Sequence, residues 1–250
     1  FIRQLAVPDA LHIHFNGAGG NVAAGKYNDG SHENRLVLAE RLADGMKRAW
    51  ENTRKTGVTG NQVNWDTRHI ALPPANGLEE EIEERMKDEE IGNYYLPNNM
   101  GMLGWLKRRQ EGKKNEIGCL SVGDARILFT PGELFVEYQL AAKAMRPDLF
   151  VAMAAYGDSG TEYIGTGASY AQGGYETGSS ATTGEAEAII MGAIRELLFD
   201  KRENDTTASR QPSIEWVRES SSAGCAGGMT PPLVNDMSSL KLPKKKEEWD

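Results

Sequence analysis

The chain has 250 residues, of which 36 are acidic and 28 are basic, and its formal net charge is −8. This length can form one large α/β domain with a substantial core. The acidic balance argues against a nucleic-acid-binding protein, which needs a concentrated basic face to neutralise phosphates. The apolar runs are too short to span a bilayer, and two cysteines are too few for a disulfide framework.

The first fifty residues predict a strand, a glycine-rich loop and a helix. The stretch ALHIHF, residues 10–15, is typical of a strand. The loop GAGGNVAAGKYNDGS follows over residues 17–31, and apolar residues then recur at helical spacing to about Trp50. Ser31 stands where it can N-cap this helix.

The glycine-rich loop is similar to a nucleotide-binding P-loop. Gly20, Gly25 and Lys26 give the spacing G-x-x-x-x-G-K, but Tyr27 follows where a P-loop carries the Ser or Thr that holds magnesium. The predicted helix also starts near Ser31 rather than at the lysine, so its N-terminus points away from the loop. We therefore prefer another role for this loop and keep nucleotide binding as a rival hypothesis.

The middle of the chain predicts a strand, two helices and a hairpin. VNWDTRHIAL, residues 63–72, is a strand candidate. The acidic stretch over residues 79–90 predicts a surface helix, and residues 102–110 lie within a second helical pattern. Residues 116–129 contain two β-rich runs joined by a Gly-Asp pair, which is typical of a hairpin.

The next stretch changes from strand period to helix period at Pro131-Gly132. Residues 149–156 then form a continuous apolar run, as a buried strand would. A loop rich in Gly and Tyr is predicted over residues 157–180. Thr182 or Thr183 can cap the helix that follows it.

The composition of the chain changes once, near residue 200. Beyond this point the sequence is polar and includes a Ser-Ser-Ser run and a Pro-Pro pair. We therefore predict one domain over residues 1–200 and a polar linker or peripheral extension over residues 201–250.

Two motifs resemble those of a known enzyme family. The first is Pro131-Gly132-Glu133, and the residues of the second are Tyr163, Ile164, Thr166, Tyr170, Tyr175 and Glu176. Together they resemble the neutral/alkaline non-lysosomal ceramidase family, in particular a bacterial branch of it. These enzymes are zinc amidases that cleave the N-acyl bond of ceramide. A weaker likeness over about residues 10–200 covers the later part of the family's catalytic domain, and it implies an α/β fold with mixed β-sheets and flanking helices.

The resemblance implies a zinc site. It assigns Glu133 and Tyr163 as ligands of Zn²⁺ and Tyr175 as a hydrogen-bond donor to the oxyanion. A catalytic zinc takes protein N or O ligands, keeps a position open for water and lowers the pKa of that water. Taken alone, a glutamate after Pro-Gly at a helix start is usually a partner of the helix dipole. The joint spacing of the two motifs favours the zinc interpretation.

The remaining zinc ligands of the family are histidines that lie well upstream of the glycine-rich loop. His12 and His14 would share one face of the predicted strand. Because they directly precede the loop, we interpret them as structural or as neighbours of the metal ligands, and direct contact with the metal stays an alternative. We therefore expect the other ligands in an upstream part of a longer chain.

The resemblance also places the glycine-rich loop beside the substrate. The equivalent loop of characterised ceramidases carries a serine with a catalytic role, and Ala23 stands at that position here. We predict a zinc-dependent hydrolase of a ceramide-like amide bond in which water is the nucleophile. The alternative is a non-catalytic descendant that binds a lipid or glycan. The family implies a secreted or periplasmic location and allows contact with a membrane surface, and it leaves the oligomeric state open.

Overall fold

The structure is a computed structural model that describes residues 4, 7–9, 11–23, 25, 29–87, 89–158 and 160–199. The described residues belong to two compact units. The predicted extension over residues 201–250 lies outside the described residues.

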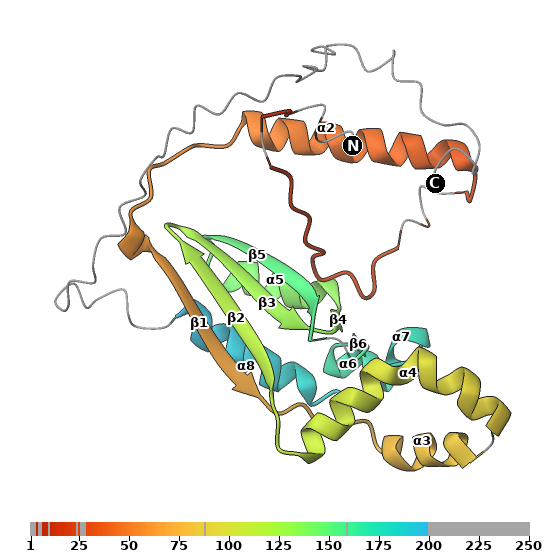
Figure 1. Ribbon diagram of the computed structural model, residues 1–250. Helices are drawn as coiled ribbons and strands as arrows, with labels where there is room; N and C mark the ends of the chain where they lie inside the picture. The colour runs from red at the N-terminus through yellow and green to blue at the C-terminus, as the bar shows by residue number, and fades with distance from the viewer. Residues whose placement is uncertain are drawn as a thin grey trace, which may run out of the picture. The chain divides into compact units, whose positions relative to one another are not determined.

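One unit contains the helix α2, which spans His32–Glu51 (Figure 1). The sequence predicts this helix and places its N-cap at Ser31, which is the N-cap residue of the structure. The Ser31 side chain makes no capping hydrogen bond. Its backbone N–H instead donates to the Asp29 carboxylate at 2.9 Å, so the aspartate orders the approach to the helix.

The predicted strand at residues 10–15 is wrong. Residues 11–17 have no regular secondary structure. One residue beyond the predicted strand, the Asn16 carbonyl accepts a hydrogen bond from the Ala155 N–H at 2.9 Å. A strand needs a ladder of such bonds, and an alternating sequence cannot by itself provide the partner.

The second unit is built on a four-stranded mixed sheet (Figure 1). Its strands, in spatial order, are β1 (Val63–Ile70), β2 (Asn115–Val122), β3 (Ala125–Pro131) and β5 (Phe150–Gly157). The pairs β1–β2 and β2–β3 are antiparallel, and β3 pairs parallel with β5. β2 and β3 form the predicted hairpin. The helix α5 (Val136–Met145) lies in the connection between β3 and β5, as parallel strands require a crossover.

One face of this sheet is covered by α5 and by α8 (Ala186–Leu198) (Figure 1). The core beneath them is made of alternate apolar residues of the strands and one face of α8, including Ile117, Leu128, Val151, Met153, Ile190 and Ile194. Trp65 and Phe150 are exposed on the opposite face. The sheet therefore has one buried and one open face.

Shorter elements complete the unit. They are the 3₁₀ turn η2 (Gly60–Gln62) and the helices α3 (Leu78–Lys87), α4 (Glu89–Gln110), α6 (Gly167–Gln172) and α7 (Tyr175–Gly178). A second sheet pairs β4 (Glu133–Leu134) with β6 (Tyr163–Ile164).

The segment after β5 differs from the prediction in two ways. The sequence predicts a loop over residues 157–180, whereas the structure has β6, α6 and α7 there. The N-cap residue of α8 is Glu185 and not a threonine. The Thr182 hydroxyl is engaged elsewhere, because it lies 3.0 Å from the Tyr170 hydroxyl.

The architecture is α/β, with mixed β-sheets and flanking helices, as the sequence predicts. In the described part of the chain, no helix is long and apolar enough to cross a membrane.

Candidate functional site

The two-stranded sheet places Glu133 beside Tyr163. Its strands are parallel, and these two residues are register partners. The Glu133 N–H donates to the Glu162 carbonyl at 2.8 Å, and the Phe135 N–H donates to the Ile164 carbonyl at 3.2 Å. The two sequence motifs, which α5 and β5 separate along the chain, therefore meet in space.

Gly132 allows the close approach of these strands. Its φ of +68° lies in the left-handed region that favours glycine. A Cβ atom at this position would lie 2.4 Å from the Thr161 Oγ1 and 2.9 Å from the Glu162 carbonyl oxygen. Glycine before Glu133 is therefore a steric requirement of the β4–β6 pair.

The Glu133 carboxyl lies in an environment that disfavours its charge. Burial raises its pKa, and the negative charge of Glu162 raises it further. The Tyr163 phenol acts in the opposite direction as a hydrogen-bond donor. A cation beside Glu133 would lower its pKa again, because a positive charge stabilises the ionised carboxylate.

The Tyr163 ring packs edge-on against the Tyr175 ring. Their centroids are 5.9 Å apart, and the ring planes meet at 70°. Tyr175 begins α7 and is 72% exposed, so its phenol is open to solvent. Burial raises the pKa of the Tyr163 phenol, and the charge of Glu133 adds to this rise. The structure therefore brings together the three residues that the sequence motifs single out.

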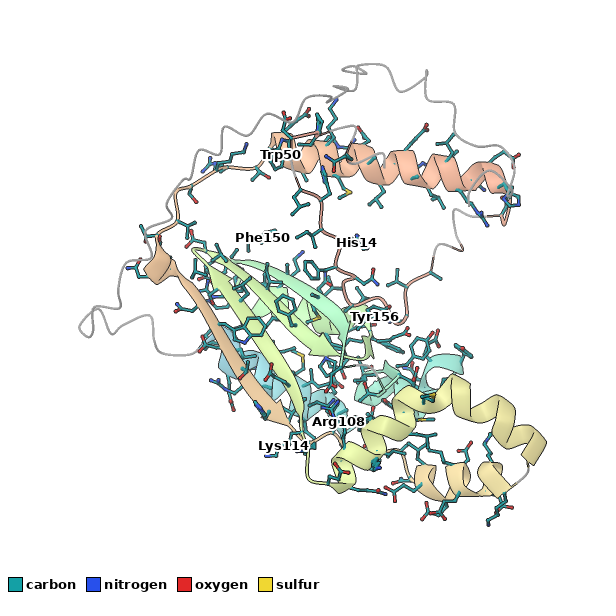
Figure 2. The ribbon with its side chains drawn as sticks, in the orientation of Figure 1. His14, Trp50, Arg108, Lys114, Phe150 and Tyr156 are labelled. Atoms are coloured by element: carbon teal, nitrogen blue, oxygen red, sulfur yellow. The ribbon has the colours of Figure 1, made fainter. Side chains whose placement is uncertain are left out.

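Tyr156 is a further phenol at this site, and sequence reasoning missed it. Burial raises the pKa of its phenol, and the Glu133 charge adds to the rise. Tyr156 lies in β5, at the end of the strand away from Phe150 (Figure 2). Its N–H donates to the Gly132 carbonyl at 2.9 Å. The only sequence signal is an aromatic residue at the end of an apolar strand, which is too common to indicate a site.

The segment from the end of β5 to the start of β6 is strained. Tyr156, Asp158 and Glu162 have φ values of 66°, 39° and 53°. Each such conformation costs about 1–3 kcal/mol and persists only where the surroundings impose it. The Asp158 carboxylate accepts hydrogen bonds from Arg108 of α4 and Asn115 of β2, both at 2.7 Å. These contacts fix the segment from two sides.

Two other residues of the second motif hold the site together. The Thr166 side chain caps α6 by accepting from the Ser169 N–H at 3.3 Å. The Tyr170 hydroxyl lies 2.8 Å from the Ser180 Oγ and 3.0 Å from the Thr182 Oγ1. Because both hydroxyls have hydrogen-bond partners within the protein, we assign Thr166 and Tyr170 structural roles.

The glycine-rich loop docks against the backbone of Glu133. The Gly20 N–H donates to the Leu134 carbonyl at 2.8 Å. A Cβ atom on Gly20 would lie 2.4 Å from the Glu133 carbonyl oxygen. Any side chain at Gly20 would therefore push the loop away from β4.

Asn21 fastens the same loop to the start of α5. Its side-chain oxygen accepts from the Val136 N–H at 2.9 Å, and its amide donates to the Glu137 carboxylate at 2.9 Å. Ala23 follows in an exposed position and carries no hydroxyl. The loop is therefore placed beside β4 by glycine and asparagine contacts, and Ala23 offers no nucleophile.

The two N-terminal histidines make contacts with residues close to them in the sequence. The His12 Nε2 lies 2.9 Å from the Val7 carbonyl oxygen, and the His14 Nε2 lies 2.9 Å from the Asn16 Oδ1. Among the described residues, no three His, Cys, Asp or Glu side chains form a group that could hold a metal ion.

Glu133 and Tyr163 nevertheless fit one part of a zinc site. Both offer oxygen donors, which zinc accepts in catalytic centres. The raised pKa of Glu133 means that its ionised form is destabilised by burial and by Glu162, and a bound cation would remove this cost. Two oxygen ligands are fewer than zinc requires, so a zinc ion at this pair would need further ligands.

The comparisons with known proteins concern the fold. No model of a known protein family and no curated protein matches the chain. Among solved structures, the neutral ceramidase from Pseudomonas aeruginosa covers 80% of this chain with a TM-score of 0.50 and 16% sequence identity. The chain has a ceramidase-like fold. It spans 38% of the length of that ceramidase. A second structure, a ceramidase complexed with C2, covers 42% of this chain and 18% of its own length, with a TM-score of 0.33 and 20% identity.

Proposed function

We propose that this chain forms part of a zinc-dependent hydrolase that cleaves the amide bond of a ceramide-like lipid. The observation that carries the proposal is the register pairing of Glu133 with Tyr163, with Tyr175 packed on the second ring. The ceramidase-like fold around this pair supports the same reaction class.

In this proposal Glu133 and Tyr163 each give one oxygen ligand to Zn²⁺. When bound, the ion supplies Lewis-acid chemistry, which polarises the scissile carbonyl and activates water. In the family that the motifs resemble, the other ligands are histidines that lie well before the glycine-rich loop. The part described here therefore contributes about half of a tetrahedral ligand set.

Tyr175 stabilises the reaction rather than holding the metal. Its exposed phenol can donate a hydrogen bond to the carbonyl oxygen as negative charge develops there. The ring contact with Tyr163 orients this donor relative to the ligand pair. Because Ala23 has no hydroxyl, the nucleophile of the proposed reaction is water and not a side chain of the glycine-rich loop.

The second candidate is a non-catalytic descendant that binds a lipid or glycan, and the observation that favours it is Ala23 itself. A protein of this kind has no need of a metal, so zinc content separates the two candidates. A secreted or periplasmic location and contact with a membrane surface remain predictions from the family resemblance.

The deciding experiment measures zinc by elemental analysis in the longest natural form of the chain. Near-stoichiometric zinc is expected in the wild type. The variants Glu133→Ala and Tyr163→Phe each remove one ligand, and zinc content should fall in both. Glu111→Ala removes an exposed carboxylate at the end of α4 and serves as the matched control, with zinc unchanged.

Hydrolysis of a short-chain ceramide is measured on the same proteins. We expect Glu133→Ala to lower kcat/KM by about a hundredfold or more, because zinc activates the water nucleophile. Little zinc in the wild type, or zinc unaffected by Glu133→Ala, would contradict the hydrolase proposal. Lipid binding without zinc would then support the non-catalytic descendant.

A further inference from the structure

Tyr156 combines features that packing alone does not explain. It is a large side chain held at φ +66°, a conformation that favours glycine. It is 36% exposed, so part of the side chain is open to solvent. Strained non-glycine residues concentrate at functional sites, where the surrounding structure imposes them.

The Tyr156 hydroxyl lies beside the glycine-rich loop. It lies 3.6 Å from the position that a Cβ atom on Gly19 would occupy. The neighbouring Gly20 is the residue that docks on the Glu133 backbone. The charge of Glu133 acts on the Tyr156 phenol, and Tyr156 in turn acts on Tyr163. The Glu133 charge therefore acts on the phenols of both Tyr156 and Tyr163.

The hydroxyl is also available for a ligand. The hydroxyls of Tyr138 and Tyr170 are engaged, the first as a donor to the Gly165 carbonyl at 2.9 Å and the second with Ser180. Within the described ranges, the Tyr156 hydroxyl has no hydrogen-bond partner among the contacts of the structure. Gly19 carries no side chain that could fill the adjoining space.

We propose that Tyr156 is a substrate-contacting residue whose hydroxyl donates a hydrogen bond to an oxygen of the bound amide. This inference rests on the proposed hydrolase function and assigns it a residue that neither sequence motif contains. The backbone bonds of Gly132 hold the donor in place, because its carbonyl accepts from the Tyr156 N–H and its N–H donates to the Gly157 carbonyl at 3.0 Å. The residue before Glu133 thus positions both Glu133 and Tyr156.

The first test is Tyr156→Phe, which removes only the hydroxyl. The kcat/KM for a short-chain ceramide should fall about 10- to 100-fold, as expected for a lost donor at a reacting carbonyl. Zinc content and melting temperature should not change, because the hydroxyl neither holds the metal nor bonds to the protein. An unchanged kcat/KM in an active, zinc-loaded protein would overturn the inference and leave the proposed function standing.

The second test is Tyr156→Gly, which relieves the left-handed backbone. We expect hydrolysis to fall at least as far as in Tyr156→Phe, because glycine also lacks the hydroxyl. Relief of the left-handed backbone should offset part of the packing that is lost with the ring, so the loss in melting temperature should be smaller than for a fully buried tyrosine. Hydrolysis close to the wild-type level in folded Tyr156→Gly would overturn the inference.

Tyr170→Phe is the matched control. It removes a hydroxyl that is bonded to Ser180 and Thr182, so the melting temperature should fall while zinc per folded protein is retained. A wild-type protein that contains no zinc and cleaves no amide would overturn the proposed function, and with it this inference. The two failures are therefore distinguishable.

Discussion

Glu133 is the residue on which the electrostatics of the site depend. Burial and the neighbouring charge of Glu162 raise its pKa above the ordinary value of 4.5. The folded protein therefore holds this proton more tightly than the unfolded chain does. The stabilisation from this group is complete below pH 4.5 and is lost as the pH rises through the raised pKa.

The variant Glu133→Gln tests this linkage. In the metal-free protein, Gln carries no charge at any pH, so we expect the variant to be more stable than the wild type at pH 7. The difference should vanish below pH 4.5, where the wild-type carboxyl is protonated in both states. Thermal unfolding with a chelator at pH 4 and pH 7 measures both values. A variant less stable than the wild type at pH 7 would contradict the assigned cause.

Added zinc should make the wild type more stable than Glu133→Gln, which is the reverse of the order expected without metal. A metal that binds only the folded state stabilises it, and the stabilisation grows with the ratio of free zinc to the dissociation constant. The wild type should gain this stabilisation and Glu133→Gln should gain less of it. Thermal unfolding of both proteins at pH 7, with and without zinc, therefore measures two effects separately. Without zinc it reports the destabilisation by the buried Glu133 charge, and with zinc it reports the contribution of Glu133 as a ligand.

At the scale of elements, the β4–β6 pair depends on Gly132. The change Gly132→Ala introduces a Cβ into the left-handed backbone and into contact with Thr161 and the Glu162 carbonyl. We expect a loss of about 2–5 kcal/mol in the free energy of unfolding, from backbone strain and overpacking together. Urea denaturation measures it.

Gly112 offers the matched control for this prediction. Its φ of +78° is also left-handed, but a Cβ atom there would meet nothing within 4 Å. Gly112→Ala should therefore cost only the backbone term, about 1–2 kcal/mol. Equal losses at the two positions would show that the close contact of Gly132 with the residues before β6 adds nothing to its role.

The elements with a repeating pattern were predictable from the sequence. The hairpin of β2 and β3, the strand β5 and the helix α8 each follow an apolar period or run, and the structure confirms them. β4 and β6 contain two residues each, too few for any period. The strand predicted at residues 10–15 had a suitable alternation but no ladder partner, which is a tertiary property.

The candidate site was predictable only in part. Motif resemblance singled out Glu133, Tyr163 and Tyr175, and the structure brings them together, while their roles stay predictions. Tyr156 and Glu162 could not be found in this way. Their left-handed backbone belongs to a segment that is held through Asp158 by α4 and β2, and these contacts leave no local pattern in the sequence.

At the scale of the whole molecule, the open face of the four-stranded sheet is the most unusual feature. By strand register, the residues that share this face include Val63, Trp65, Leu120, Val122, Ile127, Phe129 and Phe150. The ring of Phe15 packs edge-on against Phe129 at 5.9 Å, and Trp65 lies 5.2 Å from Phe129. Apolar patches of several hundred Å² are uncommon on soluble monomers, and they often coincide with binding surfaces.

This face should therefore control the association of the 250-residue chain. Trp65 and Phe150 are 52% and 70% exposed, and replacing both by Thr removes apolar surface while keeping residues that suit strands. We expect the parent chain to bind a hydrophobic dye and to sediment faster as its concentration rises, and the double variant to do both less. Leu140→Gln on α5 is the control, because Leu140 is comparably exposed but lies off the sheet. If Leu140→Gln suppresses association as strongly as the double variant, the effect belongs to general surface hydrophobicity and not to the open sheet face.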